Sequence, residues 1–221
     1  MRFVLSSIAL ACLAPLTFAA KTDEVKEREK LEKAGARVTI DDAMPDAARL
    51  RIAFAKLDDK AAAALKGCTH VAALKVEDAS KLTDRSMAIV GTFHEMRELS
   101  LFKPAITAAG LAHLKDLKEL RKLYLIDARV YDAGIAHLKD LDKLEEVDLT
   151  GTAITNTAAA TFKDLPALKL LAVSKTKFGD SGAAQLKDLK ELKELDAVNA
   201  DLSVKGAMAL EAAVPGVKVK R

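Results

Sequence analysis

Residues 106–129 read ITAAGLAHLKDLKELRKLYLIDAR, and residues 130–153 follow at once with VYDAGIAHLKDLDKLEEVDLTGTA. The second stretch repeats the first with a period of 24 residues, because AGLAHLKDL is answered by AGIAHLKDL and LYL by VDL. A repeat of this size is typical of a solenoid, in which each unit buries its apolar face against its neighbours. The sequence therefore predicts a stacked repeat fold.

Each repeat contains two apolar positions that flank one outward position, and this alternation predicts a half-buried β-strand. We call these three-residue segments strand kernels, and they are residues 50–52, 74–76, 99–101, 123–125, 147–149, 171–173, 195–197 and 217–219. Apolar residues at helical spacing follow, as at Leu111, Leu114 and Leu117. Polar helix caps are expected at Thr107, Asp132 and Thr155. The predicted unit is strand, turn, short helix and turn.

Residues 120–130 have the pattern L-x-x-L-x-L-x-x-A-x-V, which resembles the L-x-x-L-x-L-x-x-N/C-x-L pattern of the leucine-rich-repeat family. The resemblance covers residues 47–221 in about eight copies. The chain is also similar in layout to the small exported leucine-rich-repeat proteins of bacteria. The resemblance implies an α/β solenoid with a parallel β-sheet on its concave face and short helices on its convex face.

One column departs from the family pattern. The family's Asn or Cys position, which satisfies backbone groups where the chain leaves the strand, is filled here by Ala55, Ala79, Pro104, Ala128, Thr152, Thr176 and Ala200. Ala and Pro side chains cannot make these hydrogen bonds, so the backbone groups need backbone or water partners. This departure affects the expected curvature of the solenoid and not its fold.

Residues 1–20 have the composition of a secretory signal peptide, with a positive start at Arg2, an apolar run, and small residues before a cleavage point after Ala19 or Ala20. An uncleaved membrane anchor is the alternative, but the apolar run is short for a spanning helix. We therefore predict export to the periplasm or the cell exterior, with no stable membrane insertion of the mature chain.

Residues 21–46 lack the repeat pattern and precede the solenoid of residues 47–221. A helix followed by a short strand is predicted there, and such a segment would cap the bare apolar end of the first repeat. The apolar residues available to anchor this cap are Val25, Leu31, Val38 and Ile40.

No part of the sequence predicts catalysis. Cys68, the one cysteine left after the leader, lies in a column of leucines, which predicts a buried thiol rather than a nucleophile. His113 and His137 share a column, yet no carboxylate or thiol column completes a metal site. Phosphate-binding, metalloprotease and serine-nucleophile motifs are lacking. We expect a non-enzymatic chain without metal or cofactor.

Charge does not point to nucleic acid as a partner. The 35 basic and 32 acidic residues alternate along the chain and leave a formal net charge of +3. A nucleic-acid-binding protein would instead gather its basic residues in a stripe or patch. We expect a monomer whose partner is a protein or a peptide.

The outward positions of the strands are the expected binding surface, because they form a grid about 5 Å apart from strand to strand. Phe102, Tyr124 and Ile126 would form an apolar island with an aromatic anchor, a composition enriched at interaction hot spots. Charged residues complete the predicted site, namely Glu98, Lys122, Glu146 and Asp148. The alternative function is a structural or envelope-associated scaffold without a specific ligand.

Overall fold

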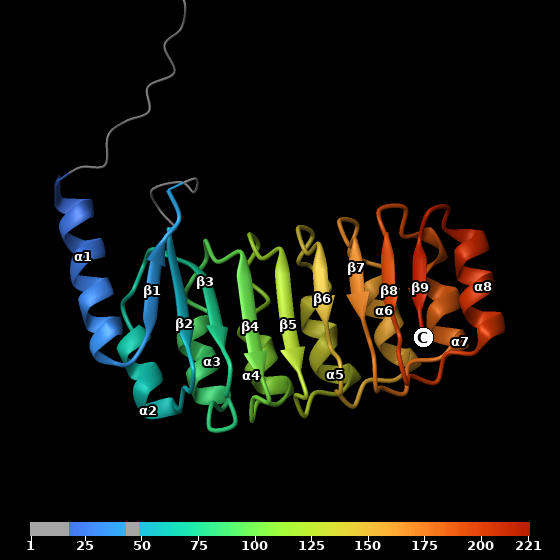
Figure 1. The fold of residues 1–221 in the computed structure, drawn as a ribbon, viewed down its shortest axis with the longest axis horizontal. Coiled ribbons are helices and arrows are strands. Elements are labelled where there is room, and N and C mark those ends of the chain that lie inside the picture. Colours follow the sequence, from blue (N-terminus) through green and yellow to red (C-terminus); the bar gives the residue numbers. More distant parts are fainter. Residues whose placement is uncertain (1–17, 43–48) are drawn as a thin grey trace, which may run out of the picture.

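The computed structural model describes residues 18–42 and 49–221, so most of the predicted leader lies outside the described residues. Within them, nine strands form one open sheet whose strand order is the chain order (Figure 1). The strands are β1 Arg37–Ile40, β2 Leu50–Phe54, β3 Val71–Val76, β4 Glu98–Phe102, β5 Lys122–Ile126, β6 Glu146–Asp148, β7 Leu170–Ala172, β8 Glu194–Asp196 and β9 Lys218–Lys220. β1 pairs with β2 in antiparallel fashion, and the other pairs are parallel.

Short helices connect the parallel strands and lie behind the sheet in Figure 1. The α-helices are α1 Phe18–Lys33, α2 Asp59–Ala62, α3 Asp84–Val90, α4 Ala108–Ala112, α5 Asp132–Ile135, α6 Ala159–Phe162, α7 Asp180–Ala183 and α8 Val204–Ala213. The 3-10 helices are η1 Ala63–Leu65, η2 Ala136–Leu138, η3 Asn156–Ala158 and η4 Ala184–Asp188. The predicted unit of strand, turn, helix and turn is therefore confirmed.

The core lies between the sheet and the helices. Leu111, Leu114 and Leu117 are fully buried, as are the kernel residues Leu123 and Leu125. Burying one such side chain contributes about 1.5–3 kcal/mol to folding. Each repeat contributes apolar residues at equivalent positions, which pack against those of the next repeat. The core is therefore one continuous cluster from the cap to the last repeat.

The strand register corrects two of the predicted kernels. In β2, Ile52 pairs with Leu74, so the first kernel is residues 52–54 and not 50–52. In β9, Val219 pairs with Leu195, so the last kernel begins at Val219 and not at Val217. A shift by two residues keeps every side chain on the same side of the sheet, and alternation alone therefore cannot detect it.

The same shift corrects the Asn/Cys column of the first repeat, where Leu57 takes the position predicted for Ala55. Elsewhere in the column, the Thr152 and Thr176 hydroxyls each donate at 2.6 Å to a carbonyl three residues earlier. The backbone amide of Ala79 donates instead to the Phe102 carbonyl of the next strand, at 2.9 Å. Within this column, side-chain hydrogen bonds to the backbone are therefore made at Thr152 and Thr176, and the backbone of Ala79 bonds to the next strand.

Two of the three predicted helix caps are confirmed. The hydroxyls of Thr107 and Thr155 accept a hydrogen bond from the amide two residues later. The prediction for Asp132 is wrong, because Tyr131 holds the cap position and Asp132 is the first helical residue. Its carboxylate instead accepts from the amide (2.8 Å) and the hydroxyl (2.7 Å) of Thr155 in the next repeat.

This contact recurs along the helix side, and we call it the polar ladder. The first residue of one helix accepts from the cap residue of the next in the pairs Asp59–Thr83, Asp84–Thr107, Asp132–Thr155, Asn156–Gly179 and Asp180–Ser203. A polar ladder of this kind satisfies amides at helix starts that have no partner within their own helix. Ala108 and Tyr131 occupy the same positions without a side chain that can make the bond, so the ladder is interrupted there.

The predicted helix and strand before the repeats are present as α1 and β1, and β1 pairs with the first strand of the repeats. Leu31 and Val38 are buried, as expected of anchors, whereas Val25 is 55% exposed and Ile40 39% exposed. Helix α1 begins at Phe18, inside the segment predicted as the leader. No helix among the described residues is long and apolar enough to cross a membrane.

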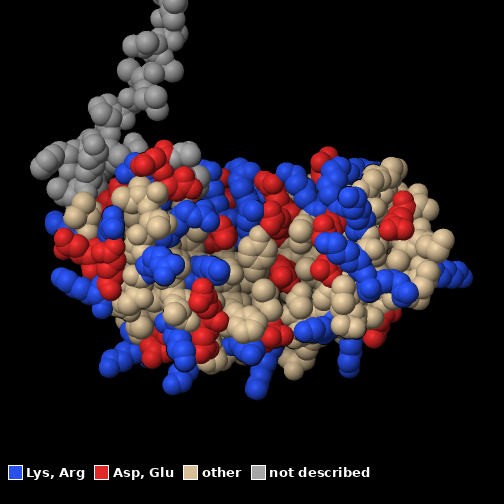
Figure 2. Space-filling view, viewed as in Figure 1, with Lys and Arg blue, Asp and Glu red and all other residues tan. Residues whose placement is uncertain are grey.

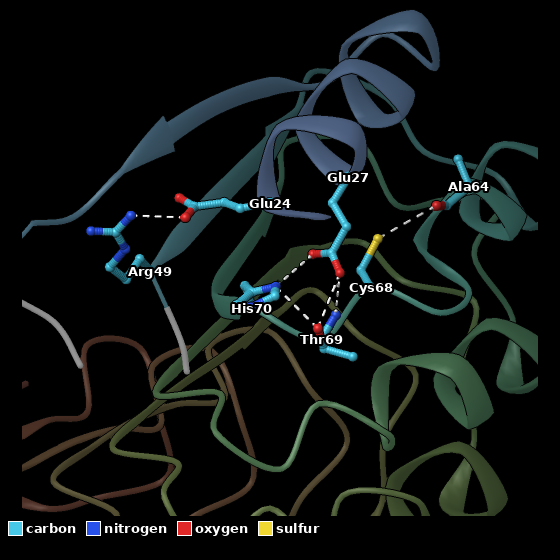
Figure 3. Close-up of polar contacts among 7 residues, drawn as sticks. All are labelled: Glu24, Glu27, Arg49, Ala64, Cys68, Thr69 and His70. Atoms are coloured by element: carbon cyan, nitrogen blue, oxygen red, sulfur yellow. Dashed lines mark hydrogen bonds and ion pairs between the residues drawn. The ribbon is translucent and has the colours of Figure 1, made fainter. Parts of the chain in front are cut away.

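Polar contacts dock α1 onto the first repeat (Figure 3). The buried Glu24 carboxylate accepts from the Arg49 guanidinium at 2.8 Å. Glu27 accepts from the amide and the hydroxyl of Thr69, at 3.0 and 3.1 Å. The predicted burial of Cys68 is confirmed, and burial, assisted by the charge of Glu27, raises the pKa of its thiol to about 11.

Candidate binding surface

The outward residues of the strands form what we call the sheet face, which is the side seen in Figures 1 and 2. Strand pairing arranges them in rows that cross the sheet. The entry row is Thr39, Arg51, Ala73, Glu98, Lys122, Glu146, Leu170, Glu194 and Lys218. The middle row is Arg37, Ala53, Lys75, Ser100, Tyr124, Asp148, Ala172, Asp196 and Lys220.

Three predicted apolar residues lie together on this face. Phe102 and Ile126 are direct neighbours on β4 and β5, and Tyr124 precedes Ile126 by two residues, so it points to the same side. All three side chains are half-buried. The ammonium of Lys103 lies 4.8 Å from the centroid of the Phe102 ring, close enough for a cation–π contact. We call Phe102, Tyr124 and Ile126 the apolar island.

Hydrogen bonds fix one edge of the apolar island. The Tyr124 hydroxyl donates to Glu146 Oε2, and the Lys122 ammonium contacts Glu146 Oε1 at 2.7 Å. Lys122 and Tyr124 stand on β5 and Glu146 stands on the neighbouring β6, so the three side chains form a cross-strand cluster. The Tyr124 ring is therefore held in one orientation on the sheet.

The same cluster shifts the ionisation of its members. Burial and the hydrogen bond to Glu146 raise the pKa of the Tyr124 hydroxyl, so it stays protonated at neutral pH. Burial works against ionisation of Glu146, but the hydrogen bonds from Lys122 and Tyr124 outweigh it and lower the pKa of that carboxyl. The hydrogen bond to Glu146 raises the pKa of Lys122. The cluster thus holds one anion, one cation and one neutral donor.

The remaining predicted site residues lie on the same face but are engaged elsewhere. Glu98 accepts from the Arg51 guanidinium at 2.6 Å, across the strand that carries Ala73. Asp148 accepts from the backbone amide of Thr150 at 2.9 Å, so this oxygen is turned toward its own strand end. Glu98 therefore belongs to a second group of residues, nearer to the N-terminal cap.

Of this second group, only Glu98 was predicted from the sequence as a binding residue. A notch of about 150 Å³ opens on the sheet face over β2 and β3 and is lined by Arg37, Thr39, Arg51, Ile52, Ala53, Ala73, Lys75 and Glu98. Its floor is made of two alanines, which look unremarkable in the sequence. Arg37 joins them only because β1 folds back onto β2, a pairing that the repeat pattern does not contain.

The histidines singled out in the sequence lie away from the sheet face. His113 and His137 are both exposed on the helix side. No group of three or more His, Cys, Asp or Glu side chains that could hold a metal ion occurs in this part of the chain. What the sheet face offers is a rigid surface with an apolar centre and charged surroundings, and Figure 2 shows blue and red side chains interspersed across it.

Comparison with known proteins agrees with this architecture. No protein-family model matches the chain, and no curated protein matches its sequence. A solved structure of internalin C2 from Listeria monocytogenes, a leucine-rich-repeat protein, superposes with a TM-score of 0.59 at 19% sequence identity. The match covers 71% of this chain and 64% of that chain, so this chain matches less than two thirds of its neighbour's length. The protein described here therefore has the fold of a leucine-rich-repeat solenoid.

Proposed function

We propose that this protein is a non-enzymatic module that binds a protein or peptide through its sheet face, at the apolar island. The observation that carries the proposal is the grouping of Phe102, Tyr124 and Ile126 beside the charged residues Lys122 and Glu146. An apolar centre surrounded by polar residues is the usual composition of a protein-binding surface.

The scaffold beneath the apolar island supports this proposal. Leu123 and Leu125, which flank Tyr124, are fully buried, and the Tyr124 hydroxyl is held by Glu146. A side chain that is already ordered loses little conformational entropy when a partner binds. The aromatic ring is therefore suited to act as an anchor.

Export belongs to the same proposal. We infer that residues 1–20 direct the chain to the periplasm or the cell exterior, where it would meet its partner. The support comes from the composition of this segment, since most of it lies outside the described residues.

A phage-displayed library of random linear peptides tests the proposed function without knowledge of the natural partner. We expect the protein to enrich binders whose affinity falls by about 2 kcal/mol or more, roughly thirtyfold, in Tyr124→Ala. The unfolding midpoint in urea is expected to change little, because the kernel leucines remain in place. Each selected peptide would be measured by titration against both forms.

The chain supplies a matched control in Tyr131, its only other tyrosine. Tyr131 is 64% exposed and lies outside the sheet, at the start of α5. Tyr131→Ala is expected to leave peptide affinity unchanged. Failure to enrich any peptide, or equal losses in both variants, would contradict binding at the apolar island and favour the scaffold alternative.

A further inference from the structure

We propose that the sheet face carries a second, carboxylate-binding site, formed by Arg37, Arg51 and Lys75 over Ala53 and Ala73. It occupies the notch of about 150 Å³ at the N-terminal end of the sheet. We call it the basic notch.

Strand pairing builds the basic notch from two alanines, each between long charged side chains. In the middle row, Ala53 of β2 stands between Arg37 of β1 and Lys75 of β3. These flanking residues are two strand steps apart, which places their Cα atoms about 9–10 Å from each other. That spacing leaves room over the Ala53 methyl group for one carboxylate with a cation on each side.

The entry row closes the other side of the basic notch. Ala73 stands between Arg51 and Glu98, whose side chains meet above it at 2.6 Å. This bridge leaves Ala73 only 5% exposed and holds the Arg51 guanidinium beside the open space over Ala53. A guanidinium has five N–H donors, so Arg51 can contact Glu98 and a ligand at once.

Charge favours an anion in the basic notch. Three of its lining side chains are cations and only Glu98 is an anion. Asp41 lies outside the lining, 3.9 Å from Arg51. Among the described residues, no ion pair or hydrogen bond engages the side chain of Arg37 or Lys75. Figure 2 shows blue side chains over this end of the sheet. Two cations that have no counter-ion among the described residues, beside an open floor, are suited to a ligand carboxylate.

The basic notch also specifies the kind of partner, and this step rests on the proposed peptide-binding function. Lys75 and Tyr124 lie in the same row, two strand steps or about 10 Å apart. An extended peptide covers that distance in about three residues. We infer that the partner is an acidic segment with Asp or Glu about three residues from an apolar or aromatic side chain.

Acetate is the probe for the basic notch itself. In an NMR titration of the ¹⁵N-labelled protein at constant ionic strength, acetate is expected to shift the Ala53 and Ala73 amides saturably. Acetamide, which has the same shape without the charge, is expected not to do so. Lys75→Gln is expected to weaken acetate binding by roughly tenfold, as expected for the loss of one charge-assisted hydrogen bond.

Two further variants separate a specific site from general attraction. Ala53→Leu fills the floor of the notch without changing any charge, and it is expected to abolish the acetate shifts. Lys139→Gln removes an exposed cation on the helix side and is expected to preserve them. Chemical shifts that do not saturate, or that persist in both Lys75→Gln and Ala53→Leu, would overturn the proposal that the basic notch binds a carboxylate.

The phage library then tests the partner. Peptides selected on the unaltered protein are expected to contain Asp or Glu, and peptides selected on Lys75→Gln are expected to lose that preference while keeping apolar residues. Equal acidic content in both selections would overturn the inferred acidic partner and leave the proposed function standing. Saturable acetate binding without any enriched peptide would support the notch and contradict the proposed function.

Discussion

Completing the polar ladder is expected to stabilise the protein. We call each hydrogen-bonded pair of the polar ladder, formed by the first residue of one helix and the cap residue of the next, a rung. The pair Ala108 and Tyr131 does not form a rung. The double variant Ala108→Asp/Tyr131→Thr would place there the same pair of residues that Asp132 and Thr155 form one repeat later.

The backbone at the missing rung already has the required geometry. Tyr131 has φ −118° and ψ 169°, close to the extended values of Thr155, φ −126° and ψ −169°. Space is also available, because Gly134 occupies the position that Gly110 holds in the preceding helix. At Gly110, an added Cβ would lie only 2.3 Å from Asp84 Oδ1, so the absence of a side chain there leaves room for the Asp84 carboxylate. Gly134 is expected to leave the same room for an aspartate introduced at position 108.

The expected gain is about 1–3 kcal/mol. A threonine cap contributes typically about 1 kcal/mol, and hydrogen bonds to a carboxylate contribute about 1.5–3 kcal/mol when shielded and less where solvent competes. Loss of the Tyr131 side chain costs little, since it is 64% exposed. In a chain of this size, each kcal/mol raises the melting temperature by about 2–4 °C.

A double-mutant cycle in urea measures the rung directly. Unfolding midpoints of both single variants and the double variant give the coupling energy, which we expect to be about 0.5–2 kcal/mol. Asp132→Ala provides the reverse test, because it removes an existing rung and is expected to destabilise the protein by a similar amount. The stabilising role of the ladder would be refuted if the changes in unfolding free energy of the two single variants simply added up in the double variant and Asp132→Ala left the stability unchanged.

Three further predictions concern the leader, the thiol and the core. We expect the exported protein to begin after Ala19 or Ala20, and an intact mass that still includes Met1 would contradict cleavage. Cys68 is expected to resist thiol reagents until the protein unfolds, because burial raises its pKa to about 11; Cys68→Ser is expected to cost about 1–3 kcal/mol. Rapid labelling of the folded protein would show that the thiol is accessible. Leu125→Ala, in the centre of the solenoid, is expected to cost about 2–5 kcal/mol and Val219→Ala, on the last strand, clearly less, as judged by urea titration. Equal losses would argue against one continuous core.

Short-range periodicity determined most of the architecture. Alternation with a period of two assigns Leu123 and Leu125 to the core and Tyr124 to the surface, and the structure agrees. The 24-residue repeat then places equivalent residues on neighbouring strands, so Phe102 and Ile126 could be predicted to lie side by side. Both properties are local or strictly repeated, and they need no knowledge of how distant segments meet.

The tertiary structure decided what local periodicity leaves open. A two-residue shift keeps the same residues buried, so only strand pairing shows that Ile52, and not Leu50, faces Leu74. The basic notch depends on a similar long-range choice. Arg51 and Ala53 share β2, but Arg37 belongs to the cap, and only the folding of β1 onto β2 brings Arg37 beside Ala53. Such contacts join residues that no repeat relates, and their geometry is therefore set by packing and not by sequence period.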